Sequence, residues 1–151
     1  MNLSKLFLLL FISFMALADE KPKPSVLTLE SAQKIAAKAE AYAKKKNWKI
    51  SIAIVSSEGN LLYFQRDIEA YTGSIEASIQ KARSSNAFQR PTSAFVESIK
   101  QGRIGMVGVK GVVALEGGVP ILMNGKHVGA IGISGAKAIE DEEAAKAALE
   151  N

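Results

Sequence analysis

The sequence of 151 residues contains no cysteine and only one histidine. Without cysteine, the chain cannot form disulfides, thiolate metal sites, a catalytic thiol, thioether-linked haem or a lipid-anchored cysteine. A single histidine excludes a multi-histidine metal site and an HExxH helix. The chain also lacks a GxSxG elbow and a phosphate-binding GxxxxGK[ST] loop. A conventional hydrolase and a P-loop nucleotide enzyme are therefore both disfavoured.

The chain also has little net charge, +4 in the formal count. The one basic run, Lys44-Lys45-Lys46, contains no aromatic residue. A nucleic-acid-binding surface normally needs a stronger basic patch, so we expect no nucleic-acid partner. These lysines are better placed at the C-terminus of a helix, where cations complement the helix dipole.

The N-terminus has the pattern of a targeting signal. Lys5 precedes an apolar run from Leu6 to Phe14, and Ala16-Leu17-Ala18 forms a small-x-small cleavage site. The run is too short to span a bilayer, so we expect no stable membrane insertion after cleavage. Residues 1–18 are predicted to be a secretory signal, and residues 19–27, which contain two prolines, an extended tether. The predicted location is periplasmic or secreted, with an uncleaved membrane tether as the alternative.

Residues 28–151 are predicted to form one domain, because a chain of 151 residues that is 48% hydrophobic and 23% charged suits a single globular core. Ten of the twelve glycines lie between Gly102 and Gly135, where Asn124-Gly125 marks a hairpin turn. The predicted elements are a helix from Thr28 to Lys46, strands at Trp48–Ser56 and Leu61–Arg66, a helix from about Ile75 that is interrupted at Pro91, a short helix around Phe95–Ile99, a strand at Val112–Leu115, a hairpin at Val119–Ser134 and an alanine-rich C-terminal helix.

This order of elements predicts an α/β fold of the α+β type. Hairpins join antiparallel neighbours, so we expect a central antiparallel sheet of five strands. The helices are expected to pack mainly on one face of it, in a two-layer architecture of the profilin/PAS-like kind. Glycines inside the strand Val128–Ile133 indicate close approach of a neighbouring backbone or a ligand.

Several separated motifs resemble one family. They are GGVP at Gly117–Pro120, VGAIGISG at Val128–Gly135, SIAIVSSEGNLLYF at residues 51–64 and KARSSNAFQRPTS at residues 81–93. Together they resemble the GlcG/HbpS-like (DUF336) family of haem-binding proteins over roughly Thr28 to Leu149. The resemblance implies an α/β sandwich, assembly into homo-oligomers, and haem binding in secreted or periplasmic members.

Site residues follow from the matched helix motif. The resemblance places Lys81, Ser84 and Phe88 beside a haem, in a cleft between this helix and the glycine-rich strands. Arg83 stands where the family has an aromatic residue, and its guanidinium is a possible partner for a haem propionate.

The candidate axial ligands for haem iron are few. They reduce to His127, Met106, Met123 and the tyrosines. His127 follows the Asn-Gly turn and is expected near a sheet end, whereas Met106 lies in the glycine-rich loop and is the more accessible methionine. The predicted metal ligand is therefore His127 or Met106. The predicted cofactor contacts are Lys81, Ser84, Phe88, Met106 and His127.

Three functions stay open at this point. The first is a haem-binding protein for capture, storage or sensing, with at most weak haem degradation and no assigned catalytic residue. The second is a cofactorless enzyme or small-metabolite-binding protein of the GlcG type, which would use Lys81, Ser84, Arg90 and Glu116. The third is an oligomeric scaffold without a ligand, in which the small residues serve subunit packing.

Overall fold

The computed structural model describes residues 26–150, so the predicted signal and most of the predicted tether lie outside the described residues. Within that range the strands form one antiparallel sheet in the order β2-β1-β4-β3. The elements are α2 (Leu29–Lys45), β1 (Ser51–Ser56), β2 (Leu61–Arg66), α3 (Gly73–Phe88), α4 (Ser93–Lys100), the 3-10 helix η1 (Ile104–Gly108), β3 (Gly118–Met123), β4 (Lys126–Ser134) and α5 (Ala138–Ala147).

Helix α2 begins and ends as its sequence predicts. The Thr28 hydroxyl accepts a hydrogen bond from the Ser31 amide at 3.2 Å, which satisfies one of the free donors of the first turn. Lys44 and Lys45 lie in its last turn, at the negative end of the helix dipole. The helix buries a stripe of small side chains against the sheet, namely Ala32, Ala36, Ala39 and Ala43.

Both predicted hairpins are present, but the sheet has four strands in the described residues rather than five. Asn124 and Gly125 have φ angles of 53° and 74°, which are the values a two-residue I′ turn needs between β3 and β4. The prediction of a strand at Val112–Leu115 is wrong. Its Val113 amide donates to the Ser84 hydroxyl at 2.9 Å, so α3 rather than a strand neighbour receives this hydrogen bond.

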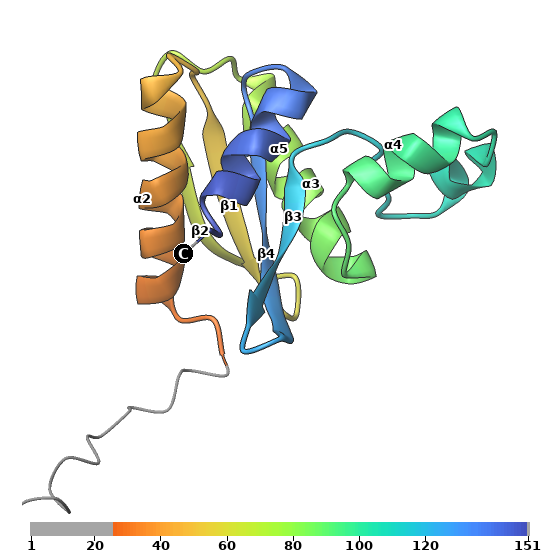
Figure 1. Ribbon diagram of the computed structural model, residues 1–151, viewed down its shortest axis with the longest axis horizontal. Coiled ribbons are helices and arrows are strands. Elements are labelled where there is room, and N and C mark those ends of the chain that lie inside the picture. Colours follow the sequence, from red (N-terminus) through yellow and green to blue (C-terminus); the bar gives the residue numbers. More distant parts are fainter. Residues whose placement is uncertain (1–25, 151) are drawn as a thin grey trace, which may run out of the picture.

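Helices cover both faces of the sheet, which corrects the prediction of helices mainly on one face. Helices α2 and α5 lie on one side and α3 on the other (Figure 1). Successive residues of β1 point to opposite faces, so Ile52 and Ile54 join the core under α2 and α5, whereas Ala53 and Val55 pack against Ala82 of α3. The profilin/PAS-like two-layer arrangement is not confirmed.

One segment projects from this body. Residues 93–117, called the arm from here on, carry α4 and η1 away from the sheet (Figure 1). The two ends of the arm are joined at a neck. There the Thr92 amide donates to the Gly118 carbonyl at 2.9 Å, and the Gly118 amide donates to the Thr92 hydroxyl at 3.0 Å. Thr92 occupies the N-cap position of α4, but its hydroxyl makes no capping hydrogen bond and holds the neck instead.

Along residues 26–150, none of the helices combines the length and the apolar character that crossing a membrane requires.

Candidate functional site

The interface where a ligand cleft was expected, between α3 and the glycine-rich strands, is closed. A methyl group added at Gly132 would lie 2.0 Å from the Ser78 carbonyl oxygen, and one added at Gly118 would lie 2.3 Å from the Lys81 carbonyl oxygen. The glycines therefore let the backbone of α3 rest directly on β4 and β3. Of the two explanations that the sequence left open for these glycines, the structure supports a neighbouring backbone.

Lys81 is an internal residue of this interface, and its side chain is 1% exposed. Its ammonium group donates to Asp141 Oδ2 at 2.8 Å and to the Ile133 carbonyl at 2.9 Å. Burial raises the pKa of the Asp141 carboxyl, while the charge of Lys81 and the Ala136 amide act in the opposite direction. Lys81 therefore ties α3 to β4 and α5 through a satisfied buried ion pair.

The other two residues taken from the helix motif, Ser84 and Phe88, lie one turn apart on α3. Ser84 is buried, and its hydroxyl accepts a hydrogen bond from the Val113 amide. Phe88, at the end of α3, is half-buried and makes an edge contact with Phe95 of α4, with ring centroids 5.3 Å apart. Ser84 and Phe88 therefore both contact the arm, whereas the Lys81 side chain pairs with Asp141 of α5.

A surface cleft lies at the arm itself. It measures about 480 Å³ and is lined by Arg90, Ser98, Arg103, Gly105 and Met106. We call it the arm cleft. Arg90 comes from the turn between α3 and α4, and the other four residues come from α4, the turn after it and η1. Met106 is thus the one predicted cofactor contact among the lining residues.

The two arginines of the arm cleft make only neutral contacts in the described part of the chain. Arg90 Nε donates to the Phe88 carbonyl at 3.4 Å, and its guanidinium carbon lies 5.9 Å from the Phe95 ring centroid. Arg103 donates to Gln101 Oε1 at 2.7 Å. None of the ion pairs found within residues 26–150 involves either arginine. The cleft is therefore a cationic site with spare donors.

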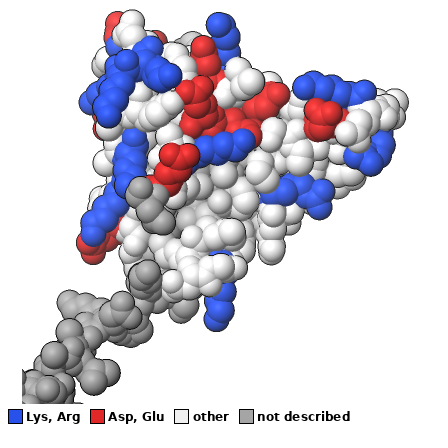
Figure 2. Space-filling view, viewed as in Figure 1, with Lys and Arg blue, Asp and Glu red and all other residues white. Residues whose placement is uncertain are grey.

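Exposed apolar side chains lie on η1, the element that contributes Gly105 and Met106 to the cleft. Ile104 and Val107 of η1 are 69% and 62% exposed, and no residue of η1 is buried. Figure 2 shows basic side chains on the arm, together with an acidic one and with surface that carries neither kind of charge. Cations beside an exposed apolar surface suit a ligand that has both carboxylates and a flat apolar body.

His127 is not part of the arm cleft. It lies at the start of β4, next to the hairpin turn, and it is half-buried. Its Nε2 is buried and has no hydrogen-bond partner among the described residues. The two candidate axial ligands, His127 and Met106, are therefore not brought into one site.

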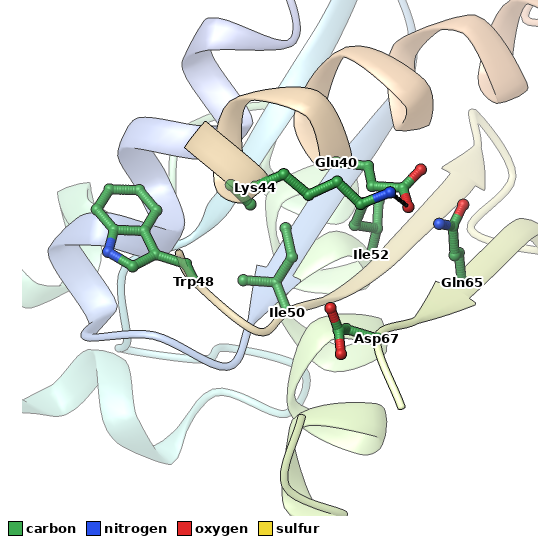
Figure 3. A pocket seen from close by; sticks show the side chains of 8 residues that line it. Glu40, Lys44, Trp48, Ile50, Ile52, Gln65 and Asp67 are labelled. Atoms are coloured by element: carbon green, nitrogen blue, oxygen red, sulfur yellow. Dashed lines mark ion pairs between the residues drawn. The ribbon is translucent and has the colours of Figure 1, made fainter. Parts of the chain in front are cut away.

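A second pocket lies between the end of α2 and strands β1 and β2 (Figure 3). Trp48, Gln65 and Asp67 line it together with the ion pair between Lys44 and Glu40, whose N and O atoms are 2.7 Å apart. Its volume of about 20 Å³ holds roughly one water molecule. This pocket is too small for an organic cofactor.

Arg103 was missed by the sequence analysis, and Arg90 entered it only as part of the small-metabolite hypothesis. The available signal was weak, since both arginines flank a short helix and only the fold of the arm brings them together. The two arginines of the arm cleft are 13 positions apart in the sequence, counted from 90 to 103.

Comparison with known proteins gives consistent matches. The family model "Haem degrading protein HbpS-like" matches residues 27–150. Protein GlcG of Escherichia coli strain K12 is 34% identical over 109 residues, which are 72% of this chain and 81% of GlcG.

Solved structures agree with this match. Protein ORFY of Klebsiella pneumoniae has a TM-score of 0.78 and 28% identity, covering 89% of this chain and 95% of ORFY. A double mutant of HbpS from Streptomyces reticuli has a TM-score of 0.75 and 31% identity, covering 89% and 92%. A PduOC:heme complex has a TM-score of 0.75 at 23% identity, covering 82% and 93%, and it supports the fold alone.

Proposed function

Because this chain belongs to the HbpS-like family of haem-degrading proteins, we propose that it binds haem and that the arm cleft is where it does so. The observation that carries this proposal is the composition of the cleft. It combines one thioether, from Met106, with two guanidinium groups that have no carboxylate partner in the described residues. The haem-related family description supports the choice of ligand.

The residues of the arm cleft fit the chemistry of haem. Its volume of about 480 Å³ lies within the usual range for small-molecule sites, roughly 300–1,000 Å³. Arginine pairs with carboxylates through two parallel hydrogen bonds, so Arg90 and Arg103 would hold the propionates. Met106 is the thioether that would face iron, and Ile104 and Val107 would shield the porphyrin from water.

Bound haem would supply iron redox chemistry, and the residues of the arm would supply binding and orientation. The guanidinium of Arg90 lies over the Phe95 ring at the base of the cleft and would there face a bound propionate. Capture, storage or sensing of haem requires no further group in this chain. We therefore propose a binding protein rather than an efficient haem-degrading enzyme.

Hemin titration of the purified protein tests this proposal. We expect a Soret band that saturates at equimolar hemin in the wild type and in Met123→Ala. Met106→Ala should shift the band and weaken binding. Met123 is the matched control, since it is a half-buried methionine in β3 outside the arm cleft.

Two outcomes would contradict the assignment. An unchanged hemin spectrum at micromolar concentrations would remove haem binding. A normal Met106→Ala titration, together with loss of the band in His127→Ala, would move the site to the β3–β4 hairpin.

We propose further that the protein works in the periplasm or outside the cell. The support is the sequence pattern of Lys5, the apolar run Leu6–Phe14 and the small-x-small site at Ala16-Leu17-Ala18. Mass spectrometry of the protein from its natural cell is expected to give a chain that begins at Asp19. A full-length chain in the cytosolic fraction would contradict this.

Self-association is also part of the proposal. The apolar side chains of Val109 and Leu115, which have no part in the proposed haem site, are exposed on the arm, and such surfaces often mark contacts between copies of a chain. Light scattering of the wild type should give a mass above that of one chain, and Val109→Ser should lower it. A monomeric wild type would contradict this.

A further inference from the structure

The arm cleft contains two cations and a single soft, neutral iron ligand. From this composition we infer that the arm cleft recognises its ligand through two carboxylates. Its ligand class is then the tetrapyrroles that carry two carboxylates, with or without iron. This inference rests on the proposed haem-binding function and narrows it, because the iron becomes dispensable for binding.

The first step concerns the charges. Arg90 and Arg103 contact a backbone carbonyl and the Gln101 amide oxygen, and neither group neutralises a guanidinium. A bidentate pair between a guanidinium and a carboxylate is stronger than a neutral hydrogen bond and has a fixed geometry. Two guanidinium groups in one cleft therefore match a ligand that carries two carboxylates.

The second step concerns the iron. Among the lining residues Met106 offers the only sulfur or imidazole ligand. The one hydroxyl among the lining residues is on Ser98, and it donates a hydrogen bond to the Ala94 carbonyl at 2.9 Å. A lone thioether is a soft ligand that contributes little to holding ferric iron, since haem proteins that use methionine usually add histidine. His127 lies in the β3–β4 hairpin and is not available to complete the pair.

The third step concerns the apolar contacts. The exposed Ile104 and Val107 lie on the arm, the half-buried Phe88 lies beside it, and none of the three side chains is a metal ligand. Removing apolar surface from water is favourable by roughly 25 cal/mol per Å², and a porphyrin ring offers this surface with or without its metal. Both favourable contributions, from the carboxylates and from the ring, are therefore independent of iron.

The test compares three ligands on the full mature protein: hemin, metal-free protoporphyrin IX and the dimethyl ester of protoporphyrin IX. Binding is followed by absorbance for hemin and by porphyrin fluorescence anisotropy for the other two. We expect the Kd of protoporphyrin IX to lie within about tenfold of the Kd of hemin. The dimethyl ester should bind more weakly than the free acid by at least about tenfold, the change that corresponds to 1.4 kcal/mol.

Variants separate the contributions of the cleft residues. The double variant Arg90→Gln/Arg103→Gln should weaken hemin and protoporphyrin IX by the same factor, about tenfold or more. Met106→Leu should change the hemin spectrum and leave the Kd of protoporphyrin IX unaltered. Lys45→Gln, which removes a cation from α2 far along the chain from the arm, is the control and should bind all ligands normally. Circular dichroism confirms that each variant is folded.

Each outcome decides between the two claims. Binding of hemin without binding of protoporphyrin IX would overturn this inference and leave the proposed haem function standing. Equal binding of the ester and the free acid would also overturn it, because the carboxylates would then be irrelevant. If none of the three ligands binds, the proposed function itself fails.

Discussion

Lys81 shows how one residue can resemble a functional group and serve the fold. The helix motif singles it out as a cofactor contact, and sequence alone does not reveal its partner because Asp141 lies 60 positions away. Folding places the two charges together where the side chains are only 1% and 2% exposed. Ser84 is similar, since its hydroxyl supports the returning arm at Val113. The helix motif drew attention to these two positions, but it did not reveal the distant residues that their side chains contact.

We predict that Lys81→Met lowers the free energy of unfolding by about 3–5 kcal/mol at pH 7, because it leaves the buried Asp141 without a counter-ion. The effect should depend on pH. Burial already raises the pKa of Asp141, and loss of the lysine raises it further. The folded variant therefore prefers the protonated carboxyl, so its deficit is small near the pKa of the unfolded chain, about 3.9, and grows as the pH rises above it.

Urea unfolding at pH 4 and pH 7 measures this effect, with wild type at each pH as the reference. Lys45→Met, at an exposed lysine of α2, is the matched control and should change stability by less than about 0.5 kcal/mol. An equal deficit at both pH values would show that Asp141 does not take up a proton.

At the scale of elements, local patterns predicted most of the fold. The alanine stripe of α2 and the Asn124-Gly125 turn depend on contacts close in sequence, and both are confirmed. The segment Val112–Leu115 has the composition of a strand but finds α3 as its hydrogen-bond partner. The glycines indicated a close approach without saying of what. Only the assembled sheet shows that α3 fills the face opposite α2 and α5.

Gly132→Ala tests this close approach. The added methyl group would lie 2.0 Å from the Ser78 carbonyl oxygen and 2.5 Å from the Ala82 amide nitrogen, so α3 has to move off β4. We expect a loss of at least about 1–3 kcal/mol in the free energy of unfolding. The control is Gly108→Ala in the arm, where the methyl group meets nothing within 4 Å. Similar stability of the two variants would disprove the tight contact.

The contact between α2 and α5 should weaken in acid. Glu143 of α5 accepts a hydrogen bond from the Tyr42 hydroxyl and lies 3.3 Å from Lys46 Nζ, and the Tyr42 bond is the main cause that lowers the pKa of Glu143. Because this pKa is lowered on folding, the stabilisation is present above the pKa of the unfolded chain, about 4.3, and is lost as the pH falls through the folded value.

Carbon-detected NMR titration of the Glu143 carboxyl checks this. Tyr42→Phe should raise its pKa toward the ordinary value. Tyr63→Phe should leave it unchanged, because the Tyr63 hydroxyl donates to Gln65 instead. An unaltered Glu143 titration in Tyr42→Phe would contradict the role of the hydroxyl.

In the whole molecule, the body and the arm differ in how they are held. The body has two apolar cores on either side of the sheet, whereas α4 buries only Phe95 and η1 buries nothing. The arm depends on its neck at Thr92 and Gly118 and on the Ser84–Val113 hydrogen bond. The sequence indicated a glycine-rich loop here, but its projection from the body follows from distant contacts.

This difference predicts where the folded protein is cut. Segments with few buried contacts open most easily, so limited trypsin digestion should begin with a single cut in the arm, at Arg103 or at Lys110. The lysines of α2 should be cut later, since that helix is packed on the sheet. The nicked protein should stay in one piece, because β4 remains paired with β1 through the whole length of β1 and the neck hydrogen bonds lie outside the cut.

Mass spectrometry identifies the first cuts, and size-exclusion chromatography shows whether the two fragments stay together. The nicked protein should lose hemin binding, because Met106 and Arg103 would no longer be held on a continuous arm beside Arg90. Hemin added beforehand should slow the first cut, since a ligand that binds only the closed arm lowers the population of the open one. First cleavage in α2, or full hemin binding by the nicked protein, would mean that the arm is neither the least stable part nor the binding element.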